Sequence, residues 1–174
     1  GASPAAADQS SAPGSVNDSQ KNSLDGLKKK IRKLTDGYDG TWSVYCKRLD
    51  TGESFCINDV SLISASLIKL YVFGAVMEDV ENGELWFDDC SEALELMIEY
   101  SDNESCNYLI DLAGGAEGVN DFITRQGFED TELYRYMLEE NFIENYTSTK
   151  ECGRLLEEVL NGEYVSEETS DLLL

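Results

Sequence analysis

A serine and a lysine three positions apart form the first candidate site of this 174-residue chain. Ser66 and Lys69 lie within "LISASLIKLYVFGAV", residues 62–76, a segment that is otherwise almost wholly apolar. Residues three apart share one face of a helix, which would bring the lysine ammonium within reach of the serine hydroxyl. Partial burial lowers the pKa of a lysine, and a neutral lysine can accept a hydroxyl proton. The spacing therefore predicts a serine nucleophile with a lysine base.

The same two residues also allow a purely structural interpretation. A serine is a frequent helix N-cap, and a lysine on a core helix can extend its ammonium into solvent. Ser-x-x-Lys occurs by chance in many proteins, so the spacing alone leaves both interpretations open. The chain contains no histidine, which excludes Ser–His and Cys–His catalysis and histidine metal sites. Acid–base chemistry would then fall to Lys, Tyr, Asp or Glu.

A second polar cluster, Ser101, Asp102 and Asn103, lies between two predicted helices. The first helix is expected over about 91–99, and the second runs to Leu112 and ends at "GG". Polar side chains on a connection between helices can point into a cleft. The cluster is therefore a second candidate part of the same site.

Two further helices are predicted from periodicity. One, over about 66–81, contains Lys69, begins at a capping serine and ends near "NG". The other, over 23–36, has apolar residues at spacings of three and four, and its opposite face is basic around "KKK" at 28–30. A solvated basic face suits an acidic chain better than the alternative, contact with anionic lipid.

A hairpin is predicted over 41–57, with "DTG" as a three-residue turn. If Leu49 opposes Glu53, Cys46 faces Cys56 across the strands. Two opposed thiols predict a disulfide and an oxidising compartment, and the alternative is two small core residues that happen to be opposed. Five cysteines in all leave at least one without a partner within this chain.

The composition limits the classes of protein to consider. Lys and Arg number 13 against 35 Asp and Glu, a formal charge of −22, so we expect no nucleic-acid partner. No run of 18 apolar residues occurs, so no transmembrane helix is expected. Residues 1–22 predict a flexible linker that places the domain outside the cell or at its surface, with a mere low-complexity tail as the alternative. Residues 23–174 are expected to form one domain.

Longer segments of the sequence resemble class A β-lactamases. Ser-x-x-Lys and Ser-Asp-Asn occur in the order typical of penicillin-recognising serine enzymes. Three segments are similar to consecutive segments of the family: "KLYVFGAVMEDVENGEL", "MIEYSDNESCNYLIDLAGGAEGVNDFITRQGFEDTELYR" and "YTSTKECGRLLEEVLNG". The similarity runs from about Ser23 to Leu174. It implies an α+β fold of the β-lactamase/DD-peptidase type, with a helical half over about 66–174 and an antiparallel sheet.

The resemblance also implies a role for each matching residue. Ser66 is expected to be acylated with Lys69 as its proton acceptor, and Ser101 to relay a proton to the lactam nitrogen. The backbone N–H of Ser66 is expected to supply half of an oxyanion hole. Asn103 and Asn141 are expected to contact the substrate. No metal or cofactor is implied. Structural support is expected from the remaining matches, which are Asp102, Asn107 and Arg135.

The family's Arg-x-Glu-Pro-x-x-Asn motif corresponds here to "RYMLEEN", so Met137 stands where the water-activating glutamate is expected. Methionine cannot take a proton, so we expect slow hydrolysis of an acyl-enzyme unless Glu139 or Glu140 substitutes. The segment between Glu84 and Ser101 is also shorter than in the family, which would open the cleft.

No Lys-Thr-Gly appears, and the family's C-terminal strands are absent from this chain. We expect a further segment of the same protein to complete the sheet, because a lone hairpin is marginal. The preferred function is serine acyl transfer on a small β-lactam or a D-alanyl peptide. The alternative is a penicillin-binding or lactam-sensing relative, D-alanyl-peptidase-like or non-catalytic. A purely structural acidic domain would leave both motifs unexplained.

Overall fold

The computed structural model describes residues 24–140 and 143–174, so the predicted linker over 1–22 lies outside the described residues. The chain divides into two units, Gly1–Gly40 and Thr41–Leu174. The first unit contains helix α2 (Leu24–Thr35), which confirms the helix predicted there. No helix among the described residues has both the length and the apolar character needed to cross a membrane.

The second unit begins with an antiparallel hairpin of β1 (Val44–Lys47) and β2 (Ser54–Ile57), as predicted, but with a different register. Arg48 N donates to Glu53 O over 2.8 Å, and Gly52 N donates to Arg48 O over 2.8 Å. The turn therefore has four residues and places Gly52 at φ 72°, a conformation that suits glycine.

The predicted pairing of Cys46 with Cys56 is wrong because of this extra turn residue. Cys46 opposes Phe55, and Cys56 opposes Tyr45. Opposed residues share a face and consecutive residues alternate between faces, so the two thiols point to opposite sides of the hairpin. All five cysteines lie within the described residues, and all are free thiols.

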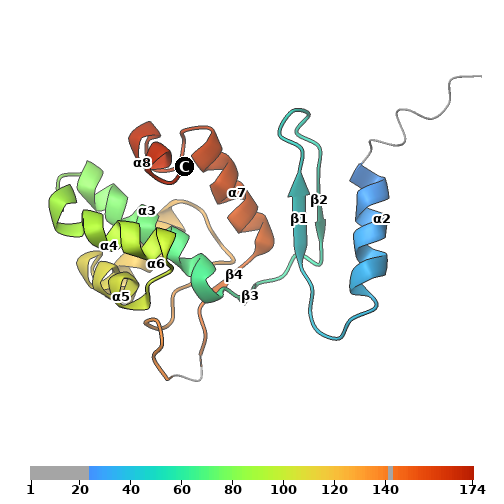
Figure 1. The fold of residues 1–174 in the computed structure, drawn as a ribbon, viewed down its shortest axis with the longest axis horizontal. Coiled ribbons are helices and arrows are strands. Elements are labelled where there is room, and N and C mark those ends of the chain that lie inside the picture. The colour runs from blue at the N-terminus through green and yellow to red at the C-terminus, as the bar shows by residue number, and fades with distance from the viewer. Residues whose placement is uncertain (1–23, 141–142) are drawn as a thin grey trace, which may run out of the picture. The chain divides into compact units, whose positions relative to one another are not determined.

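The rest of this unit is a helical layer built around α3 (Ile68–Glu81). Nine of the fourteen residues of α3 are buried, which is typical of a helix surrounded by protein. Figure 1 shows α3 packed among three helices, and the contacts agree. Its neighbours are α4 (Phe87–Glu99), α5 (Asn103–Leu112) and α6 (Gly115–Arg125).

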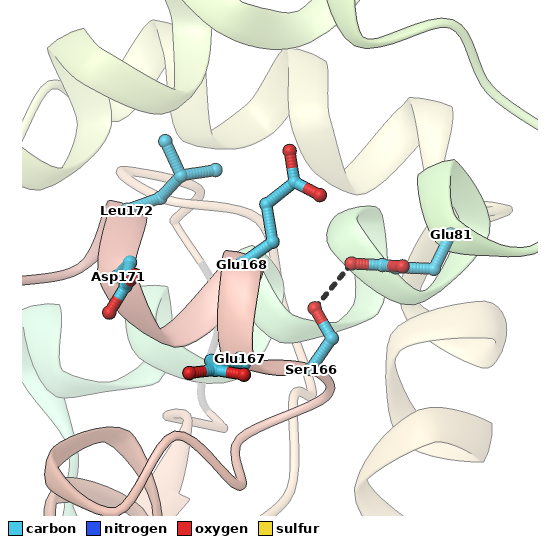
Figure 2. Close-up of a pocket in the computed structure, with 6 residues that line it drawn as sticks. All are labelled: Glu81, Ser166, Glu167, Glu168, Asp171 and Leu172. Atoms are coloured by element: carbon cyan, nitrogen blue, oxygen red, sulfur yellow. Dashed lines mark hydrogen bonds between the residues drawn. The ribbon is translucent and has the colours of Figure 1, made fainter.

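Helices α7 (Thr149–Leu160) and α8 (Glu167–Leu172) complete the layer. The hairpin packs on α7, where Gly153 leaves room for Tyr45: an added Cβ would lie 2.2 Å from its ring. Figure 2 shows one contact between the start of α8 and the end of α3, the hydrogen bond that the Ser166 hydroxyl donates to Glu81. The Thr169 hydroxyl donates to the same carboxylate over 3.0 Å. Ser166 also caps α8 by accepting from Thr169 N.

Residues 131–147 leave the helical layer and return to it, and we call this segment the Met137 loop. Its ends pair as an antiparallel bridge, in which Glu132 and Tyr146 exchange two backbone hydrogen bonds of 3.0 and 3.1 Å. Its last strand, β4 (Tyr146–Thr147), pairs with β3 (Leu62–Ile63), which leads directly into the Ser66 segment. The loop is therefore joined to the chain that carries the predicted nucleophile.

Gly74 on α3 is buried and lies in close contact with two aromatic side chains. A Cβ there would lie 2.1 Å from the Tyr164 hydroxyl and 2.6 Å from the Phe122 ring. The Tyr164 hydroxyl donates to Leu70 O over 2.8 Å, so it cannot move aside without losing that bond.

We expect Gly74→Ala to lower the free energy of unfolding by about 1–3 kcal/mol, the usual cost of overpacking a core. Urea unfolding measures the change. Gly26→Ala is the matched control, because nothing lies within 4 Å of a Cβ there and alanine favours a helix. Equal stability of Gly74→Ala and the wild type would contradict this account of the core.

Candidate active site

Four of the predicted site residues meet at one point. Ser66 comes from a 3₁₀ turn, η1 (Ala65–Leu67), and Lys69 from the first turn of α3. Ser101 comes from the connection between α4 and α5, and Asn103 is the first residue of α5. The Lys69 ammonium lies 3.4 Å from Ser66 Oγ, 3.0 Å from Ser101 Oγ and 2.8 Å from Asn103 Oδ1. The two sequence motifs therefore form one cluster, as predicted.

The nucleophile candidate, Ser66, is exposed and lies above a buried base. Its Oγ accepts a 2.9 Å hydrogen bond from the Ser101 hydroxyl, which is also exposed. The prediction that a serine caps this helix is wrong: α3 starts at Ile68, and neither Ser64 nor Leu67 makes a side-chain cap hydrogen bond. The Ser66 hydroxyl instead accepts hydrogen bonds from the Lys69 ammonium and the Ser101 hydroxyl.

Lys69 is only 2% exposed, and its three oxygen partners on Ser101 and Asn103 are all uncharged. Burial lowers the pKa of its ammonium below the ordinary value, while the negative charge of Asp102 acts against that shift. The lysine therefore loses its proton more readily than an exposed lysine does. This is the property that a base for Ser66 needs.

The backbone of Ser101 is held in the left-handed region, at φ 55°. Its carbonyl oxygen accepts from the Lys69 ammonium over 2.5 Å, and Asp102 N donates back to Leu96 O at the end of α4. A left-handed conformation is uncommon for a residue other than glycine, so the surrounding contacts must maintain it. They turn the chain sharply enough to aim both the hydroxyl and the carbonyl of Ser101 at Lys69.

Asp102, for which structural support was predicted, caps α5. Its carboxylate accepts from Ser105 N over 2.7 Å at the start of that helix. This hydrogen bond lowers the pKa of the Asp102 carboxyl. The cap fixes where α5 begins, and Asn103 is the first residue of that helix.

The Met137 loop is pinned to α5 by Asn107, one turn after Asn103. The Asn107 amide donates to Met137 O over 3.1 Å and accepts from Met137 N over 2.7 Å. Arg135 closes the loop by donating to Glu144 over 3.1 and 2.5 Å. Met137 is half-buried against the core. The predicted substrate contact Asn141 lies outside the described residues.

The two glutamates considered as substitutes for the missing base are both exposed. Glu139 accepts from Tyr136 N over 3.2 Å and so closes a turn of its own loop. The Glu139 carboxylate is therefore engaged in a hydrogen bond with the backbone of its own loop.

Two asparagines that support the loop were missed from the sequence. Asn120 on α6 pairs with both N and O of Leu133, each over 2.9 Å. Asn145 accepts from the N–H groups of Tyr134 and Arg135 and donates to Arg135 O. Neither position lies in a motif, and both partners are far enough along the chain that no local pattern predicts them.

The Asp102 cap makes a pH-dependent contribution to stability. Because the folded pKa of Asp102 is lowered, its contribution is present above the unfolded pKa and is lost as the pH falls through the folded pKa. We expect Asp102→Ala to be less stable than wild type at pH 7, with a difference that shrinks on acidification. Urea midpoints across pH measure it, and Asp102→Asn, which can still accept from the Ser105 amide, is the control. A difference that does not change with pH would contradict the charged cap.

Comparison with known proteins agrees with this geometry. The solved structure named PBP-A matches with a TM-score of 0.79 at 26% identity, covering 87% of this chain and 67% of that one. A beta-lactamase from Chitinophaga pinensis matches with a TM-score of 0.77 at 20% identity, covering 86% and 68%. One from Sphaerobacter thermophilus has a TM-score of 0.74 at 21% identity, covering 87% and 68%. The last two show likeness of fold.

The chain thus spans about two thirds of the length of these solved structures. No curated protein sequence matches it. The model of the beta-lactamase enzyme family matches residues 26–90 and 89–174, which together include every described element of the cluster. With Ser66, Lys69 and Ser101 in contact, the chain belongs to the beta-lactamase enzyme family.

Proposed function

We propose that this protein is a serine acyl-transfer enzyme that reacts with β-lactams and hydrolyses the resulting acyl-enzyme slowly. The observation that carries the proposal is the exposed pair of hydroxyls, Ser66 and Ser101, above the buried Lys69, together with the aliphatic side chain of Met137 in the adjoining loop. The membership of the family supports the reaction type.

Acylation follows from the contacts of the cluster. Neutral Lys69 accepts the hydroxyl proton of Ser66, and Ser66 Oγ forms a bond to the lactam carbonyl carbon. The lactam C–N bond then breaks, and the Ser101 hydroxyl gives its proton to the leaving nitrogen. Ser101 takes in return the proton that Lys69 accepted from Ser66, because its Oγ lies 3.0 Å from the lysine nitrogen. The N–H of Ser66 lies in the first turn of a helix, where such groups lack intrahelical acceptors and suit an oxyanion.

Deacylation needs a base that polarises a water molecule beside the ester. Met137 has no ionisable group, and the Glu139 carboxylate is engaged with the backbone of Tyr136. Slow release of the acyl group is the consequence. Asn103, which contacts Lys69, and Asn141 are the proposed substrate contacts.

The second candidate function is that of a penicillin-binding or lactam-sensing relative, D-alanyl-peptidase-like or non-catalytic. Met137 favours it, and so does the 26% identity to the structure named PBP-A. In that case the acyl-enzyme itself is the functional state. The residue composition of 1–22 supports a location outside the cell or at its surface, with that segment as a tether.

The first experiment tests the nucleophile. The full-length protein should gain one covalent penicillin adduct, located on Ser66 by peptide mass spectrometry, because Lys69 activates that hydroxyl. Ser66→Ala should remove the adduct, whereas Ser91→Ala on α4 should leave it unchanged. An intact wild-type protein that forms no adduct would sink the enzymatic proposal.

The second experiment tests Met137 in turnover. With a chromogenic cephalosporin, we expect a burst of about one equivalent and then slow release, because loss of a general base costs about 10²–10⁴-fold. Met137→Glu should speed the slow phase and leave the burst unchanged. Met137→Gln, of similar length but without a base, should not. Rapid turnover of the wild type without accumulated acyl-enzyme would show that another group, with Glu139 or Glu140 first in line, is the base.

A further inference from the structure

A chain of buried hydroxyls runs behind the site and ends on a carboxylate. The Tyr71 hydroxyl lies 2.9 Å from Thr147 Oγ1, and Thr147 Oγ1 lies 2.7 Å from Thr131 Oγ1. Thr131 Oγ1 in turn donates to Glu151 Oε2 over 2.6 Å. All four side chains are buried, including the glutamate, which is 8% exposed.

The carboxylate sets the direction of the chain. An ionised carboxylate only accepts hydrogen bonds, so the single hydroxyl hydrogen of Thr131 goes to Glu151. Thr131 must then accept from Thr147, and Thr147 must accept from Tyr71. Each bond polarises the next, so the chain acts as one cooperative unit rather than as three independent contacts. Cys152 Sγ, 3.7 Å from the Tyr71 hydroxyl, is placed to complete its far end.

The second oxygen of Glu151 holds the backbone where the loop begins. Glu151 Oε1 accepts from Glu129 N over 2.5 Å and from Asp130 N over 3.0 Å. The carboxylate also lies in the first turn of α7, where the helix dipole favours a negative charge. Together with the Thr131 hydroxyl, three donors compensate for its burial.

The four residues come from the parts of the fold that must stay in register at the site. Thr131 and Thr147 are the two ends of the Met137 loop, and Thr147 pairs with Leu62, four residues before Ser66. Tyr71 lies on α3 two residues after Lys69. One buried network thus joins the loop, the nucleophile segment and the lysine helix.

We propose that Glu151 is a positioning residue, which holds the Met137 loop in register with α3 through the Thr131–Thr147–Tyr71 chain. A buried polar network often adds little net stability over an apolar core of the same shape. The network here contributes specificity. Each hydroxyl donates to one acceptor only, so the hydrogen bonds can all form in a single position of the loop ends. The proposal concerns geometry around the site and assigns no contact between Glu151 and substrate.

The first test is hydrogen exchange of the loop amides that have known acceptors, those of Leu133, Tyr134, Arg135 and Met137. Glu151→Gln keeps the size of the side chain, but its NH₂ group must face either the backbone N–H groups or Thr131. We expect these amides to exchange about 10- to 100-fold faster. Glu157 lies on α7, as Glu151 does, and forms an ion pair with Lys47 on β1. Glu157→Gln breaks that ion pair and is the control for a general loss of stability.

A second pair of variants keeps the test decisive if Glu151→Gln folds poorly. Thr147→Val removes the middle hydroxyl at nearly constant shape and should accelerate exchange of the same amides by a similar factor. Thr147→Ser keeps the hydroxyl and should stay near wild type. Loop exchange in Glu151→Gln or Thr147→Val that is no faster than in Glu157→Gln would overturn the proposal.

The rate of deacylation distinguishes a positioning role of Glu151 from a contribution to stability alone. This test rests on the proposed function. In the Met137→Glu background, adding Glu151→Gln should slow deacylation about 10- to 100-fold, because the new carboxylate is misplaced, while acylation changes much less. Equal deacylation with and without Glu151→Gln would overturn the positioning role. If Met137→Glu itself fails to speed deacylation, the proposal that Met137 makes deacylation slow is wrong. The hydrogen-exchange data still decide the role of Glu151.

Discussion

The burial of the Lys69 ammonium is the constraint on which the site depends. A cation at 2% exposure is costly unless polar groups replace the water it loses, and here the replacements are the carbonyl and hydroxyl of Ser101 and the amide oxygen of Asn103. Supplying them requires the chain between α4 and α5 to turn through a left-handed serine. The same contacts place both serine hydroxyls beside the lysine. The same contacts therefore both replace the water around the Lys69 ammonium and assemble the cluster.

The Met137 loop is organised by side chains that imitate backbone partners. Asn107, Asn120 and Asn145 each use one amide to satisfy both a donor and an acceptor of the loop, as a neighbouring strand would. The described parts of this loop are thus held by side chains although they have little regular secondary structure. The contacts at position 137 are made by its backbone, so they do not depend on which side chain stands there.

Local spacing explains which residues of the cluster the sequence could bring together. Ser66 and Lys69 are three apart on adjoining helical turns, and Ser101 and Asn103 flank a helix cap, so short-range geometry was enough to predict that each pair lies close. The predicted hairpin register was wrong because "DTG" is part of a four-residue turn, and a shift of one residue puts Cys46 and Cys56 on opposite faces of the hairpin. The helix start failed for a related reason, since the Ser66 hydroxyl serves the cluster instead of a cap.

The sequence by itself determined the spacing of Ser66 and Lys69, the absence of histidine, the methionine at position 137 and the helical periodicity, because each of these is a property of identity or of near neighbours. Only the tertiary structure decided how buried Lys69 is, which oxygens surround it, and which face of the hairpin each thiol occupies. It also decided that Glu151, an ordinary-looking acidic residue on a helix, lies at the end of a buried hydroxyl chain. Those outcomes depend on contacts between residues far apart in the chain, such as Tyr71 and Cys152, which are 81 positions apart. No local pattern encodes such distances, since the partners meet only when the helices pack.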